Sequence, residues 1–78
     1  EAINPTHIKV FSMNNNICVY NDTKLEARIS VFDLAGRNCG YKTVGSNEII
    51  TFPVQLQQAY IVRAVTDVLS ESTKIIIR

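Results

Sequence analysis

Clusters of turn-forming residues divide this chain into short segments, and their spacing constrains the fold more than any other feature. They recur about every eight to twelve residues, a spacing typical of all-β sandwiches and barrels. The clusters are Asn14–Asn16, Asn21–Thr23, Asp33–Gly36, Gly45–Asn47 and Thr66–Ser70. Between them apolar and polar residues alternate as in half-buried strands, and no helical stripe is found. The pattern predicts an all-β fold: an immunoglobulin-like antiparallel β-sandwich of about seven strands.

The expected strands follow from this alternation. They are His7–Ser12, Ile17–Tyr20, Leu25–Phe32, Asn38–Val44, Glu48–Phe52, Ala59–Val65 and Glu71–Arg78. The inward positions of the two strongest are Ala27, Ile29 and Val31, and then Tyr60, Val62 and Ala64. Gly40 marks a bulge or an edge strand, and Gly45–Asn47 predicts a hairpin turn. In the connection at 54–58, we expect Val54 and Leu56 to close one end of the core.

Length and composition indicate a single small domain. The chain has 78 residues, 46% of them hydrophobic, and a net charge of +1. A domain of this size has a thin core. We expect residues 1–6, which include Pro5, to be a linker or lead-in, and residues 7–78 to form the sandwich. Because the sequence starts at Glu1 without an initiator Met or signal peptide, we expect it to be a piece of a longer protein.

Charge and hydropathy count against two classes of partner. The eight Lys and Arg residues are scattered along the sequence, so no basic patch indicates nucleic acid. The longest apolar run, Ile75–Ile77, is far too short for a transmembrane segment.

The reactive side chains do not suggest an enzyme, a metal site or a cofactor. His7 is the single histidine, and it has no local Ser or Cys partner. Cys18 and Cys39 lack the C-x-x-C spacing of a zinc site; they are either a disulfide or two free thiols. The carboxylates show no spacing that pairs an acid with a base. No glycine-rich loop for phosphate is present.

Three patterns have both a structural and a functional interpretation. Asp33 and Arg37 can form an ion pair across a turn that Gly36 permits, since glycine tolerates positive φ. Asn21–Thr23 matches the N-glycosylation sequon, which in a bacterial protein carries no meaning. Six aromatic residues form either a sugar-binding platform or fillers of the core and edges: Phe11, Tyr20, Phe32, Tyr41, Phe52 and Tyr60.

Three stretches taken together carry a family resemblance. They are Ile29–Arg37 (ISVFDLAGR), Ala59–Arg63 (AYIVR) and Lys74–Arg78 (KIIIR). In this order and spacing the chain resembles the C-terminal sorting domains of the type IX secretion system, or a closely related C-terminal domain of unknown function from gut bacteria. The resemblance extends from about His7 to Arg78. The chain departs from the family pattern at Gln58, where the family usually has Gly, in the Gly-free loop Thr66–Ser70, and in its cysteines.

The resemblance implies a non-catalytic domain at the end of an exported protein. The domain would carry an N-terminal cargo domain of the same chain from the periplasm across the outer membrane, to the cell surface or the medium. Its partners would be the outer-membrane translocon and a sortase-like peptidase, which would cleave in or before Glu1–Thr6. Asp33, Gly36 and Arg37 would shape the recognised corner, Tyr60 would anchor the core, and Lys74 and Arg78 would belong to the signal strand.

A second class of function stays open beside this one. The chain is then an immunoglobulin-like accessory module that binds glycan or protein at the cell surface. A cluster of exposed aromatic side chains favours this alternative, whereas an enzyme requires a pocket with converging polar groups.

Overall fold

The computed structural model describes residues 8–78 and contains seven strands and no helix. The strands are β1 (Ile8–Met13), β2 (Asn16–Asn21), β3 (Ala27–Asp33), β4 (Asn38–Val44), β5 (Ile49–Pro53), β6 (Ala59–Val65) and β7 (Ser70–Ile76). The all-β prediction is therefore confirmed. The expected lead-in at 1–6 and His7 lie outside the described residues. Within 8–78, the chain has no helix that could cross a membrane.

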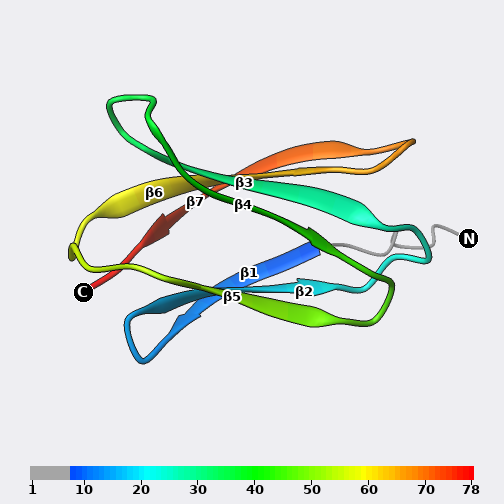
Figure 1. Cartoon of the computed structure of the whole chain (residues 1–78), viewed down its shortest axis with the longest axis horizontal. Helices are drawn as coiled ribbons and strands as arrows, with labels where there is room; N and C mark the ends of the chain where they lie inside the picture. Colours follow the sequence, from blue (N-terminus) through cyan, green and yellow to red (C-terminus); the bar gives the residue numbers. More distant parts are fainter. Residues whose placement is uncertain (1–7) are drawn as a thin grey trace, which may run out of the picture.

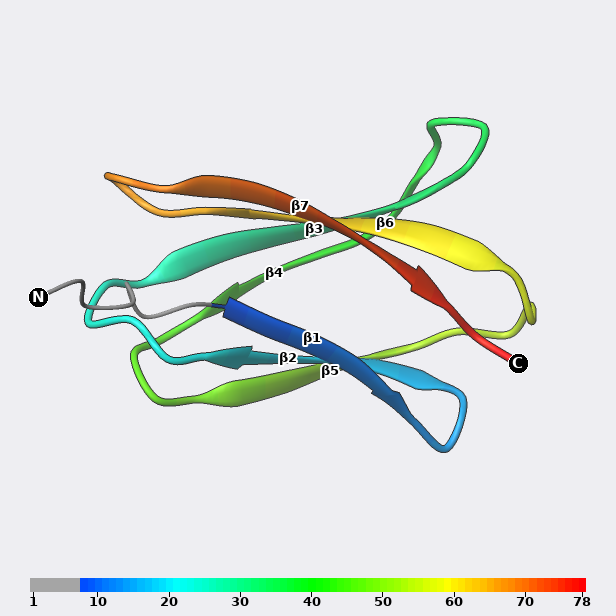
Figure 2. The same cartoon turned by 180° about the vertical axis from the view of Figure 1, so that it is seen from behind.

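The strands form two antiparallel sheets that face each other as a sandwich (Figures 1 and 2). One sheet has the order β1-β2-β5 and the other the order β4-β3-β6-β7. In a constant-type immunoglobulin domain the fourth strand pairs with the fifth. Here β4 pairs with β3 instead, so the fourth strand belongs to the other sheet. The remaining six strands keep the immunoglobulin arrangement.

The core lies between the sheets and is built from the predicted inward positions. Ala27 and Ile29 are fully buried, and Val31 on the same face of β3 is 1% exposed. The facing residues of β6 are buried as well, while Arg63 on the opposite face is exposed. β3 and β6 therefore each contribute one apolar face to the core, as the period of two requires.

The first turn is a two-residue hairpin, as predicted. Asn14 and Asn15 have φ angles of 53° and 61°, and Met13 pairs with Asn16 across the loop. Two successive positive φ values are typical of the type I′ turn that matches strand twist, and Asn adopts them at low cost.

The predicted hairpin at Gly45–Asn47 is wrong, because this turn joins strands of different sheets. The turn itself is present: the Glu48 N–H donates to the Gly45 carbonyl at 3.2 Å, and Asn47 has a φ of 61°. However, β4 pairs with β3 and β5 pairs with β2. Turn-forming residues determine where the chain reverses. They do not determine which strand the next strand pairs with, because that pairing depends on contacts between residues distant in sequence.

The fourth strand is an edge strand with a bulge, as Gly40 indicated. The pairing of β3 with β4 shifts register so that Val31 faces Gly40 while Phe32 faces Asn38, which leaves Cys39 as the extra residue. A Cβ on Gly40 would lie 2.8 Å from the Phe52 ring. A side chain at this position would therefore have to displace the Phe52 ring, where β4 of one sheet approaches β5 of the other.

The prediction for the connection at 54–58 holds for only one residue. Val54 packs against the core, but Leu56 is 60% exposed and does not close its end. The hydroxyl of Tyr60 donates to the Leu56 carbonyl at 3.0 Å, so a hydrogen bond to its backbone joins Leu56 to this core residue.

The sequon residue Asn21 is part of the structure's interior. Its side chain is fully buried, and its Nδ2 group donates to the carbonyls of Leu25, Val44 and Gly45 at 2.7, 3.1 and 3.2 Å. Its Oδ1 accepts from the backbone and the hydroxyl of Thr23. This amide joins the β2–β3 and β4–β5 connections, so in the folded domain it is closed to a glycan.

Candidate recognition corner

The turn after β3 is held by one carboxylate. Asp33 Oδ1 accepts hydrogen bonds from the backbone N–H groups of Ala35 and Arg37, both at 2.9 Å, and Oδ2 accepts from Arg37 Nε at 2.8 Å. The Gly36 N–H donates to the Asp33 carbonyl at 3.0 Å, and the Asp33 N–H donates to the Arg37 carbonyl at 3.0 Å. We call Asp33–Arg37 the corner. These five hydrogen bonds lie within five consecutive residues, so the corner is held largely by its own groups.

Glycine is needed at the corner for its backbone conformation. Gly36 has a φ of 87°, in the region that L side chains rarely adopt, and no atom lies within 4 Å of the place a Cβ would occupy. A larger side chain would therefore fit in the available space. Glycine is favoured at position 36 because it adopts a positive φ angle at low cost.

The corner lowers the pKa of Asp33 from its ordinary value of 3.8. The largest cause is the hydrogen bond from the backbone N–H of Arg37, and the Arg37 guanidinium and the N–H of Ala35 act in the same direction. Burial opposes them, since loss of water disfavours the charged form. Asp33 is thus an ionised carboxylate with a structural role. Both of its oxygens accept hydrogen bonds within the corner, so they are not available for proton transfer.

The two partners of the ion pair differ greatly in exposure. The side chain of Arg37 is 79% exposed, while that of Asp33 is 7% exposed. The guanidinium is held through Nε alone, which leaves both terminal nitrogens facing solvent without a partner within residues 8–78. Arg37 therefore presents an oriented cation whose terminal donors fit a planar anion.

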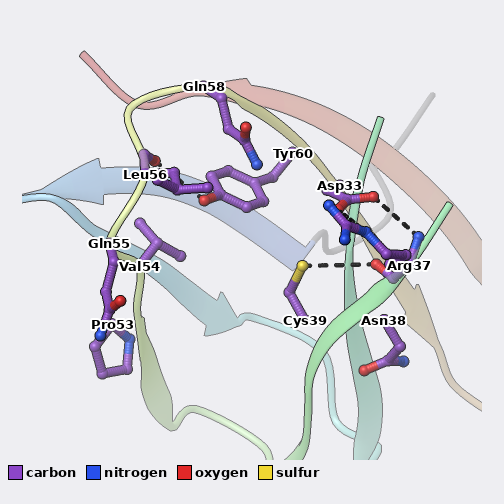
Figure 3. Close-up of a pocket in the computed structure, with 10 residues that line it drawn as sticks. All are labelled: Asp33, Arg37, Asn38, Cys39, Pro53, Val54, Gln55, Leu56, Gln58 and Tyr60. Atoms are coloured by element: carbon purple, nitrogen blue, oxygen red, sulfur yellow. Dashed lines mark hydrogen bonds and ion pairs between the residues drawn. The ribbon is translucent and has the colours of Figure 1, made fainter. Parts of the chain in front are cut away.

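A depression of about 390 Å³ lies beside the corner (Figure 3). Its walls are the corner and the start of β4 on one side and the β5–β6 connection on the other. The lining residues are Asp33, Arg37, Asn38, Cys39, Pro53, Val54, Gln55, Leu56, Gln58 and Tyr60. Tyr60 is 3% exposed and packs in the core, so its expected anchoring role is consistent with its place here.

The structure brings together four of the six predicted residues. Asp33 and Tyr60 are direct partners in the pairing of β3 with β6, and Gly36 and Arg37 belong to the corner. Lys74 is exposed on the outer face of β7, opposite Ile61. Arg78 lines a second depression of about 360 Å³, beside the β1–β2 hairpin. The corner, this hairpin, the β5–β6 connection and the last residues all lie at one end of the sandwich (Figures 1 and 2).

The cysteines are free thiols and not a disulfide. Cys18 is buried in β2 of one sheet, and Cys39 is exposed in β4 of the other. Cys39 Sγ donates to the Arg37 carbonyl at 3.6 Å, which places this thiol at the corner. Among residues 8–78, no group of three or more His, Cys, Asp or Glu side chains could hold a metal.

The six aromatic residues do not form a single platform. Phe52 and Tyr60 are buried, Phe11 and Tyr20 belong to the three-stranded sheet, and Phe32 and Tyr41 to the four-stranded one. Sequence reasoning also missed Asn38, Cys39 and Gln58 as parts of the corner depression. The bulge signal at Gly40 was the sequence feature nearest to Asn38 and Cys39.

Comparison with known proteins adds no family to this geometry. No family model matches the chain, and no curated protein matches it.

Proposed function

We propose that this domain is a non-catalytic C-terminal signal that directs export of a larger cargo protein across the outer membrane by type IX secretion. The observation that carries the proposal is the corner. The residues responsible for the family resemblance, Asp33, Gly36 and Arg37, form a turn that supports itself and presents an exposed cation. A translocon that recognises folded surfaces can contact such a corner without unfolding the domain.

The charged side chains of the domain support a role in which another protein recognises its folded surface. Asp33 is the one carboxylate that lines the two depressions described above, and its oxygens are committed to the corner. Lys74 and Arg78 are exposed on and after the last strand, whose Ile75 packs against the core. We therefore assign recognition to the corner and the last strand, and give no residue a catalytic role.

The proposed path runs from the periplasm to the cell surface or the medium. The partners are the cargo domain that precedes this one, the outer-membrane translocon, and a sortase-like peptidase that removes the domain. The cleavage point lies in or before residues 1–6, which are outside the described part of the chain.

A reporter fusion tests this function. A reporter placed before the chain is expected to reach the surface of a host with a type IX system, where added protease degrades it. Deleting Lys74–Arg78 should trap the fusion in the periplasm. Because this deletion also removes the buried Ile77, a second variant, Lys74→Ala with Arg78→Ala, keeps the strand and its core contacts.

Two exposed lysines elsewhere provide the matched control. Lys9→Ala with Lys24→Ala removes the same charge from β1 and the β2–β3 connection. This fusion should reach the surface as the parent does. Export of the Lys74/Arg78 variant at the parent's level would refute a role for these residues, and retention of the parent fusion in the periplasm would refute the function.

A further inference from the structure

The outer face of the four-stranded sheet gathers cations that are scattered in the sequence. Arg28 of β3, Arg63 of β6 and Lys74 of β7 are all exposed and point away from the core. Arg63 of β6 pairs with Ser30 of β3, which is two residues after Arg28. Lys74 of β7 pairs with Ile61 of β6, which is two residues before Arg63. Each cation is thus the diagonal neighbour of the next, about 7–8 Å apart. The three form a diagonal stripe across adjacent strands.

Within β3, β4, β6 and β7, no carboxylate lies on this face; exposed Glu26, two residues before Arg28, stands at its end and forms no ion pair with the stripe. Asp22 and Glu26 lie in the β2–β3 connection, Asp33 in the corner, Glu48 before β5, Asp67 in the β6–β7 turn, and Glu71 on the inward side of β7 opposite Ala64. Within residues 8–78, the three cations have no ion pair or side-chain hydrogen bond. The stripe therefore holds uncompensated positive charge in a chain whose net charge is only +1.

Hydroxyl groups flank the stripe on the same face. They belong to Ser30, Tyr41, Thr43, Ser70 and Ser72. None of these side-chain hydroxyls is bonded within residues 8–78, so each can donate to or accept from a ligand. Tyr41 is 57% exposed on the edge strand β4 and offers one ring face beside them.

We propose that this outer face binds an anionic polysaccharide. The cations fit sulfate or carboxylate groups along an extended chain, the hydroxyls fit sugar hydroxyls, and the ring of Tyr41 fits the apolar face of a sugar ring. Single-stranded nucleic acid requires a succession of exposed rings on which bases stack, and Tyr41 is the only ring more than half exposed on this face. The proposal does not depend on the export role.

Binding of fluorescent dextran sulfate to the 78-residue chain, followed by anisotropy, tests the proposal. Counterion release at three contacts gives a slope of about −2 in log affinity against log salt, so binding should weaken roughly 20-fold between 50 and 200 mM salt. Arg28→Gln with Arg63→Gln leaves one contact, and the same salt step should then weaken binding only about threefold. Uncharged dextran should not bind.

A control of equal charge separates a site from a general charge effect. Lys9→Gln with Lys24→Gln changes the net charge by the same amount at exposed positions away from the stripe. It should keep the parent's affinity and salt slope, and circular dichroism should show all variants folded. Equal loss in both double variants, absence of binding by the parent chain, or tighter binding to single-stranded DNA of matched charge would each overturn the proposal.

Discussion

Substitution of Asn21 by Ala should be among the most damaging single changes outside the apolar core. Its fully buried amide serves three carbonyl groups and accepts two hydrogen bonds from Thr23. The carbonyls of Leu25 and Gly45 can bind water instead, and the Thr23 hydroxyl keeps the Leu25 carbonyl as an acceptor. The buried Val44 carbonyl and the buried Thr23 N–H would lose the bonds that they make to Asn21. A buried unsatisfied group costs about 1–3 kcal/mol, so two of them should lower the free energy of unfolding by about 2–6 kcal/mol.

That loss is large for so small a domain. At about 0.05–0.15 kcal/mol per residue, a chain of this length has a stability of roughly 4–12 kcal/mol. Thermal unfolding followed by circular dichroism should show the midpoint lowered by about 10 °C or more. Gln57→Ala removes the same kind of group from an exposed position and should change stability by less than about 0.5 kcal/mol.

Asn21→Asp gives a sharper test of the geometry. A carboxylate at this position faces three carbonyl oxygens, so at neutral pH the variant should be at least as unstable as Asn21→Ala. Burial and these oxygens should raise the new carboxyl's pKa, and stability should recover as the pH falls and the group is protonated. A melting temperature of Asn21→Ala within 2 °C of the parent would refute the assigned hydrogen bonds.

Three further predictions concern the corner and the thiols. Folding lowers the pKa of Asp33, so the ionised carboxylate stabilises the folded domain fully above pH 3.8, and this stabilisation is lost as the pH falls through the lower pKa of the folded state. An NMR titration that gives the Asp33 carboxyl a pKa at or above 3.8 would contradict this prediction. Gly36→Ala should cost about 1 kcal/mol in urea unfolding because of its positive φ, and an unchanged midpoint would show that the backbone is not constrained there. A thiol reagent should modify Cys39 at once and Cys18 only on unfolding; rapid reaction of both would contradict the burial of Cys18.

The strand faces were predictable because they depend only on local alternation. In β3 and β6 every second residue is apolar, and burial follows that parity from Ala27 to Val31 and from Tyr60 to Ala64. The corner was predictable for the same reason: Asp33, Gly36 and Arg37 interact within five residues.

Features that depend on distant contacts were not predictable. The turn at Gly45–Asn47 has the residues of a hairpin, but β4 joins the other sheet, where Val44 pairs with Ala27, 17 residues before it in the sequence. Likewise, the cationic stripe exists only because the register places Arg63 and Lys74 diagonally beside each other. The depression beside the corner needs the β5–β6 connection to lie against the bulge in β4, which no local pattern encodes.

The most direct test of whether the export machinery recognises the corner is the cellular location of a reporter fusion that carries Arg37→Ala. The substitution removes an exposed side chain, while Asp33 keeps its bonds to the backbone N–H groups of residues 35 and 37, so the domain should stay folded. We predict that the reporter then accumulates in the periplasm while the melting temperature stays close to that of the parent. A folded Arg37→Ala fusion that reaches the surface in the parent's amount would contradict recognition through the corner.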